Sequence, residues 1–138
     1  MSDNPFVGTW TYRSFLNDPD VATDFDKLEF GRGTIVIDEA PMQILKGTIG
    51  GTGWSLALKG ARDYGNPMHV RFQGTGTIDK APWVYDYDGY LVPHWPHGVE
   101  QRPAIVGSVI RTIAHPGSQP GSMNPAGLVA SFYAVKVY

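Results

Sequence analysis

A chain of 138 residues suits one domain with a single hydrophobic core. Its 42% apolar and 17% charged residues, together with 17 glycines and 11 prolines, favour a β-protein over a helical one. The formal net charge of −2, the absence of cysteine and the lack of an apolar run near ~20 residues argue against a nucleic-acid-binding surface, thiolate chemistry and a membrane span.

The sequence has no linker-like stretch and no internal repeat, so we expect residues 1–138 to form one domain. The first five residues lack the basic and apolar regions of a signal peptide. We therefore expect a cytoplasmic protein, although the mature form of a secreted protein would share this start.

Eight stretches have the residue pattern of β-strands, and turn residues separate them. In chain order they are 6–15, 28–39, 43–50, 53–61, 68–78, 83–92, 104–115 and 128–138. Between the first two, Asp18 and Pro19 could begin a helix, but the acidic residues that follow have little apolar pattern. We expect a loop there with at most one helical turn.

Alternation along the central strands predicts that one face of each strand is buried. Trp54, Leu56 and Leu58 share one face of their strand, and two glycines, Gly74 and Gly76, on the apolar face of the next strand would leave room inside. Short connections between eight successive strands favour an antiparallel up-and-down meander, and closure removes the exposed edges. We predict an all-β, eight-stranded antiparallel up-and-down barrel, whose lumen holds packed side chains or one small ligand.

The opening segment Phe-Val-Gly-Thr-Trp, residues 6–10, resembles the first strand of the calycins, which include lipocalins, fatty-acid-binding proteins and avidins. Residues 53–59 are similar to a central avidin strand. The Thr-Asp-Tyr motif and C-terminal helix of lipocalins are missing, as is the two-helix lid of fatty-acid-binding proteins. The resemblance implies a calycin-like barrel in which Trp10 plugs one end and Arg111, from a late strand, lies across its indole to close the barrel.

Consecutive connections of a meander alternate between the two ends of a barrel. With Trp10 near the start of the first strand, the opposite end carries residues 16–27, 50–53, 79–82 and 116–126, and we expect the ligand to enter there. The loop 93–103, which contains His94 and His97, falls at the Trp10 end. These two histidines are weak candidates for a metal site because Pro96 prevents a regular helix and no third ligand has a suitable spacing, so we expect no metal and no cofactor. The loop is better explained as a rigid cap or a subunit contact.

Aromatic residues on the inward faces predict a binding lumen. The candidate ligand-binding residues, in the lumen or at its mouth, are Tyr12, Trp54, Phe72, Tyr85, Tyr87, His115 and Tyr133. We expect a small aromatic or amphipathic molecule to bind among them. Asp86 and Asp88 would then point outward on their strand, away from the lumen.

Two other functions are compatible with the same residues. One is a cofactor-free barrel enzyme, such as a cyclase, isomerase or hydrolase, in which a histidine transfers a proton. The other is a purely structural oligomeric barrel. Strands 104–115 and 128–138 are apolar on nearly both faces, so we expect a homo-oligomer that packs through them. We expect neither a nucleic acid nor a membrane as a partner.

Overall fold

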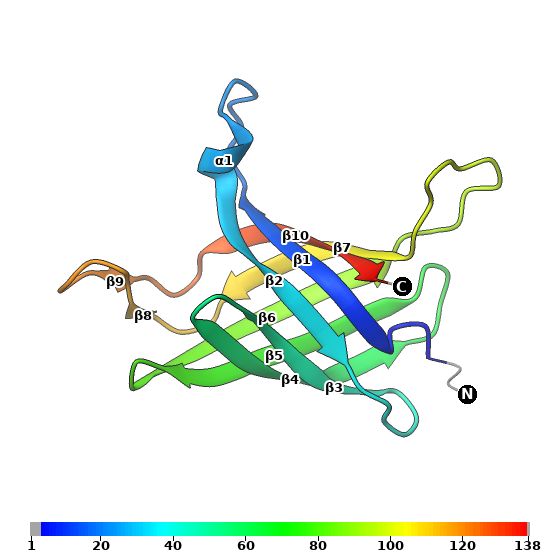
Figure 1. The fold of residues 1–138 in the computed structure, drawn as a ribbon, viewed down its shortest axis with the longest axis horizontal. Helices are drawn as coiled ribbons and strands as arrows, with labels where there is room; N and C mark the ends of the chain where they lie inside the picture. Colours follow the sequence, from blue (N-terminus) through cyan, green and yellow to red (C-terminus); the bar gives the residue numbers. More distant parts are fainter. Residues whose placement is uncertain (1–3, 138) are drawn as a thin grey trace.

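A computed structural model of the chain describes residues 4–137, which form a closed barrel of antiparallel strands (Figure 1). Neighbouring strands around the barrel follow the order β1-β10-β7-β6-β5-β4-β3-β2, so each pairs with the next strand of an up-and-down meander. The barrel strands are β1 (Gly8–Leu16), β2 (Glu29–Ile37), β3 (Ile44–Gly51), β4 (Trp54–Asp63), β5 (His69–Ile78), β6 (Ala81–Leu91), β7 (Ala104–Arg111) and β10 (Val129–Val137). The predicted all-β, eight-stranded antiparallel barrel is confirmed.

Two details differ from the sequence prediction or refine it. The seventh strand ends at Arg111, and the chain then forms a separate hairpin of β8 (His115–Pro116) and β9 (Met123–Asn124). It ends there because β10 begins at Val129, opposite Ile110, and leaves no barrel strand beside the chain on that side. The helix α1 (Phe25–Leu28) is one turn long, as expected for the loop before β2.

Alternation positions the core. On β4, Leu56 and Leu58 are buried while Ala57 and Lys59 are exposed, as predicted. The same pattern around the barrel fills the interior with aliphatic and aromatic side chains, and each of the larger ones contributes roughly 1.5–3 kcal/mol through burial. The space beside Gly74 and Gly76 is not empty, because the Leu56 side chain packs onto both glycines.

The Gly-x-Trp motif closes one end of the barrel. Trp10 is fully buried, and its indole nitrogen donates a hydrogen bond to the carbonyl oxygen of Phe6 at 2.9 Å. Gly8 has a φ of +138° and lies against the side chain of Lys136, which would meet a Cβ at 3.0 Å. Glycine is suited to this position because both the backbone angle and the close approach disfavour a side chain.

The connections divide between two ends, which we call the floor and the mouth. The floor contains Trp10 and the loop 92–103, which extends from the barrel at the right of Figure 1. The mouth carries the segments 17–28, 52–53, 79–80 and 112–128, including α1 and the β8–β9 hairpin. Within residues 4–137, no helix has the length and hydropathy needed to cross a membrane.

Candidate ligand-binding site

The barrel contains a cavity of about 200 Å³ near the mouth. Six aromatic rings, one leucine and one glycine line it: Tyr12, Phe30, Gly31, Trp54, Leu56, Trp83, Tyr85 and Tyr87. The rings of Phe30, Trp54 and Trp83 come from near the first residues of β2, β4 and β6, all of which begin at the mouth. The cavity is therefore a ring-lined chamber at the entrance of the barrel.

Aromatic side chains fill the barrel below the cavity. The ring of Tyr87 stacks on Phe72 at 5.1 Å between centroids and meets Phe132 edge-on at 5.7 Å. Burial raises the pKa of Tyr12 to about 12, although hydrogen bonds from the Ser14 and Tyr87 hydroxyls partly offset this effect. Burial also raises the pKa of Tyr87 well above its ordinary value. Both phenols are protonated at neutral pH, so the base of the cavity presents neutral hydroxyl groups.

A chain of three polar side chains begins at the cavity wall with Tyr85 and continues behind the wall to His115 and Arg111. Nδ1 of His115 is 2.9 Å from the carbonyl oxygen of Pro116, which can only accept, so Nδ1 carries the hydrogen and Nε2 accepts in the neutral ring. The hydroxyl of Tyr85, 2.7 Å from Nε2, donates to it. That hydroxyl also accepts a hydrogen bond from Nε of Arg111 at 3.0 Å. Both polar functions of the Tyr85 hydroxyl are thus satisfied within the protein.

The environment of His115 keeps its ring neutral. Burial lowers its pKa below the ordinary value, and the nearby Arg111 cation lowers it further, while the hydrogen bond to Pro116 opposes the shift. The imidazole stacks on the indole of Trp83, with 3.8 Å between ring centroids and 10° between ring planes. His115 therefore attaches the β8–β9 hairpin to the cavity wall.

The structure brings most of the predicted lumen residues together. Tyr12, Trp54, Tyr85 and Tyr87 line the cavity. Phe72 lies one layer deeper, against Tyr87. His115 is at the mouth end, one residue behind the wall through its bond to Tyr85.

The lumen assignment of Tyr133 is wrong. Its ring lies on the outer wall, where it stacks on Phe15 at 6.2 Å and its hydroxyl accepts a hydrogen bond from Nη1 of Arg13 at 3.3 Å. The buried members of β10 are instead Ala130, Phe132 and Ala134. Because this strand is apolar on both faces, its residue pattern did not reveal which set faces the lumen.

Phe30 was missed because a β-bulge changes the alternation of β2. The pairing of β1 with β2 shifts between Ser14 and Phe15, so that Phe15 pairs with Glu29 while Ser14 pairs with Gly31. Phe30 and Gly31, which are consecutive, consequently both line the cavity. Ile35 and Ile37 of β2 point into the barrel, so uninterrupted alternation would place Phe30 on the outer face.

The predicted contact between Arg111 and Trp10 is also wrong. Because β7 runs from the floor to the mouth, its last residue, Arg111, lies at the opposite end from Trp10. The guanidinium carbon of Arg111 is 5.2 Å from the ring centre of Phe30 and 5.8 Å from that of Tyr85. The cation over Trp10 is Lys136, its direct cross-strand partner, with Nζ 5.6 Å from the ring centroid.

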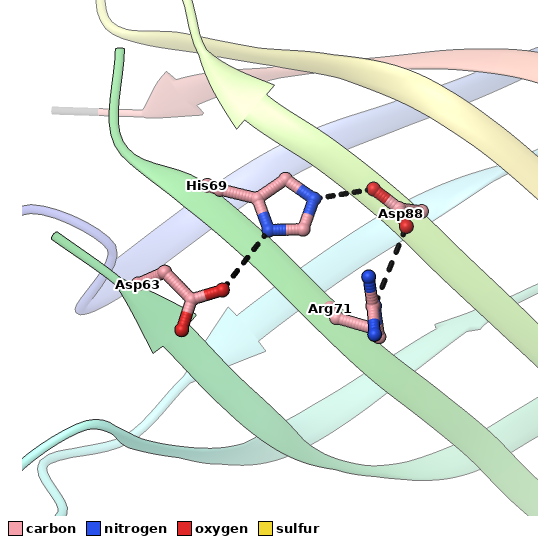
Figure 2. Close-up of polar contacts among 4 residues, drawn as sticks. All are labelled: Asp63, His69, Arg71 and Asp88. Carbon is pink, nitrogen blue, oxygen red and sulfur yellow. Dashed lines mark hydrogen bonds and ion pairs between the residues drawn. The ribbon is translucent and has the colours of Figure 1, made fainter. Parts of the chain in front are cut away.

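A polar cluster that sequence analysis did not single out lies on the outer wall (Figure 2). His69 lies between two carboxylates, with Nε2 2.5 Å from Oδ1 of Asp88 and Nδ1 3.3 Å from Oδ2 of Asp63. Arg71 approaches the other oxygen of Asp88 at 3.4 Å. The hydrogen bond to Asp88 is the main cause that raises the pKa of His69. Every member is exposed or half-exposed, so the cluster faces solvent.

The neighbouring acidic residue and the floor histidines lie apart from the cavity. Asp86 points outward and accepts hydrogen bonds from Gln73 and Thr112, at 2.8 Å and 2.9 Å. His94 and His97 are exposed in the floor loop. Among residues 4–137, no three or more histidine, aspartate or glutamate side chains are grouped so that they could hold a metal ion.

Comparison with known proteins adds no relative to this description. No protein-family model matches the chain, and neither a curated protein nor a solved structure gives a significant match.

Proposed function

We propose that this protein is a calycin-like binding module that holds a small planar molecule in the cavity at its mouth. The observation that supports the proposal is the lining: a chamber of about 200 Å³ in which six of the eight lining residues are aromatic. Aromatic rings contribute large apolar contact areas and stack on flat ligands, and the Tyr hydroxyls beneath them can form hydrogen bonds with a polar edge.

The volume limits the size of the ligand. Pockets for drug-sized molecules usually measure roughly 300–1,000 Å³. A chamber of about 200 Å³ suits a ligand of one or two rings and would exclude a long acyl chain. The filled lumen below Tyr87 keeps the ligand near the mouth.

The arrangement around His115 favours binding over proton-transfer catalysis. Both ring nitrogens of His115 are already engaged, by Tyr85 and by the Pro116 carbonyl. A ligand in the cavity therefore meets the ring of Tyr85 first, whereas a general base must come within hydrogen-bond reach of the proton that it removes. The enzyme alternative would need this chain to rearrange.

A cavity-filling variant tests the proposal. Gly31 lines the chamber, and a Cβ there would meet only the movable Ser14 hydroxyl closely, at 3.2 Å. Gly31→Leu should occupy the chamber, whereas Thr34→Leu, on the outer face of the same strand, should add the same side chain outside. The probe is 2-naphthalenemethanol, a neutral two-ring alcohol, titrated while the fluorescence of the tryptophans is followed.

We expect the unmodified protein and Thr34→Leu to bind the alcohol, and Gly31→Leu to bind at least tenfold more weakly. Native mass spectrometry of the purified protein should also reveal an organic molecule that is released on unfolding. Equal binding by Gly31→Leu and the unmodified protein would show that the chamber is not the site.

A further inference from the structure

The buried charges of the barrel are of one sign. Two arginines are buried: Arg62 is 4% exposed and Arg111 is 6% exposed. None of the buried residues among 4–137 is an aspartate or a glutamate. No ion pair joins either arginine to a carboxylate in this part of the chain. Removing a cation from water is costly, and buried charges are normally paired.

The two arginines differ in their surroundings. Arg62 comes from near the end of β4, in the floor half, and its guanidinium group lies over the ring of Tyr64 and donates a hydrogen bond to the Tyr64 hydroxyl at 3.3 Å. Its Nε and Nη1 have no hydrogen-bond partner within residues 4–137. Arg111 lies at the mouth against the rings of Phe30 and Tyr85, two residues that line the cavity. Its Nε donates a hydrogen bond to the Tyr85 hydroxyl, and its Nη1 donates one to the Pro125 carbonyl oxygen.

Only Arg111 is therefore placed to act on a ligand. Its guanidinium group lies against the rings of Phe30 and Tyr85, at 5.2 Å and 5.8 Å from their centres, and both rings line the chamber. Inside a barrel, where water does not screen the field as it does at the surface, a cation at this distance favours negative charge in the adjacent cavity. Neutral His115 beside it adds no charge of its own.

From this arrangement we infer that the ligand of the mouth cavity is a planar aromatic anion, such as an aromatic carboxylate, whose charge Arg111 balances. The inference rests on the proposed binding function and names the class of its ligand. The aromatic rings that line the cavity provide contact area for the aromatic part of the ligand. Arg111, which has no carboxylate partner within residues 4–137, favours a negative charge on it.

Acidic residues of the mouth oppose an anion only weakly. The segment 17–29 contains Asp18, Asp20, Asp24, Asp26 and Glu29, all exposed. Water and salt screen exposed charges beyond about 8–10 Å, whereas the buried Arg111 is screened much less. The acidic segment should slow the approach of an anion at low salt without cancelling its attraction in the cavity.

Three probes that share a naphthalene ring and differ in charge test the effect of ligand charge on affinity: 2-naphthoate, 2-naphthalenemethanol and 2-naphthylmethylammonium. We expect the unmodified protein to bind the carboxylate at least tenfold more tightly than the alcohol, and the ammonium most weakly. In Arg111→Met the preference for the carboxylate should fall to less than threefold, with little change for the alcohol. Arg111→Lys, which keeps the charge, should retain most of the preference.

Arg62→Met is the matched control, because it removes the other buried and unpaired guanidinium. It should leave the order of the three probes unchanged. Binding of the alcohol as tightly as the carboxylate, or an unaltered preference in Arg111→Met, would overturn the ligand class while the binding function stands. Failure of all three probes to bind would remove the binding function itself and the inference with it.

Discussion

The hydroxyl of Tyr85 donates a hydrogen bond to Nε2 of His115 over 2.7 Å, so a cavity-lining ring from β6 is joined to the hairpin that follows β7. Arg111 donates to the same hydroxyl at 3.0 Å. One oxygen atom thereby connects three segments at the mouth.

Tyr85→Phe should destabilise the fold by about 1–3 kcal/mol, because it leaves Nε of Arg111 and Nε2 of His115 buried without a partner. The measurement is urea unfolding at pH 7.5. Tyr133→Phe removes an exposed hydroxyl that accepts one hydrogen bond, and should change the stability by less than about 0.5 kcal/mol. Equal effects of the two substitutions would contradict the central role of the Tyr85 hydroxyl.

His115 should make the fold less stable in mild acid. Its pKa is lowered in the folded state from an ordinary value of about 6.5, so the unfolded chain takes up a proton first as the pH falls. This contribution to stability is complete above pH ~6.5 and is lost as the pH falls towards the folded-state pKa. The polar side chains facing His115 are the Tyr85 hydroxyl and the Arg111 guanidinium. Between pH 7.5 and pH 5, the thermal unfolding temperature of His115→Gln should fall less steeply than that of the unmodified protein.

His69 should have the opposite effect. Asp88 and Asp63 raise its pKa and outweigh the partial burial and the Arg71 cation, which lower it. Its contribution to stability is therefore complete below pH ~6.5 and is lost as the pH rises through the folded-state pKa. In the unmodified protein, stability should decline above pH 6.5 in part because of His69. His69→Gln should remove that part of the decline. If the stability of His69→Gln declined as steeply over this range as that of the unmodified protein, the ion pairs with Asp63 and Asp88 would contribute nothing measurable in solution.

Association of two or more copies through β7 and β10 is a further prediction. On the outer face Val106 lies opposite both Tyr90 and Tyr133, and Ile110 lies opposite Val129, so two apolar rows flank the polar row of Ser108 and Ser131. Light scattering after size exclusion should give a mass above one chain at micromolar concentration. Val106→Glu should reduce that mass, whereas Thr75→Glu, on the outer face of β5, should not. A monomer at this concentration would end the homo-oligomer prediction.

The fold could be predicted because turn residues and alternation are local properties of the sequence. Ala57 and Leu58 lie on opposite faces of β4 as a direct consequence of strand geometry, and the meander then assigns His115 to the mouth. The position of Trp10 opposite Lys136 depends on register, which follows from pairing between the two ends of the chain and not from local pattern.

The errors at the site have specific physical causes. Tyr133 belongs to a strand that is apolar on both faces, so its parity is ambiguous in the sequence. Phe30 is the unpaired residue of a bulge that brings two consecutive residues to the same cavity. The outer-wall ion pairs of His69 join three strands, and no spacing along the chain reveals them.

The stacking of His115 on Trp83 has a mechanical consequence. One face of this indole carries the imidazole at 3.8 Å between centroids, and the same side chain lines the cavity. A ligand that tilted the Trp83 ring would press on His115, which is in the first strand of the β8–β9 hairpin. We therefore expect the order of the β8–β9 hairpin to change when the cavity is filled.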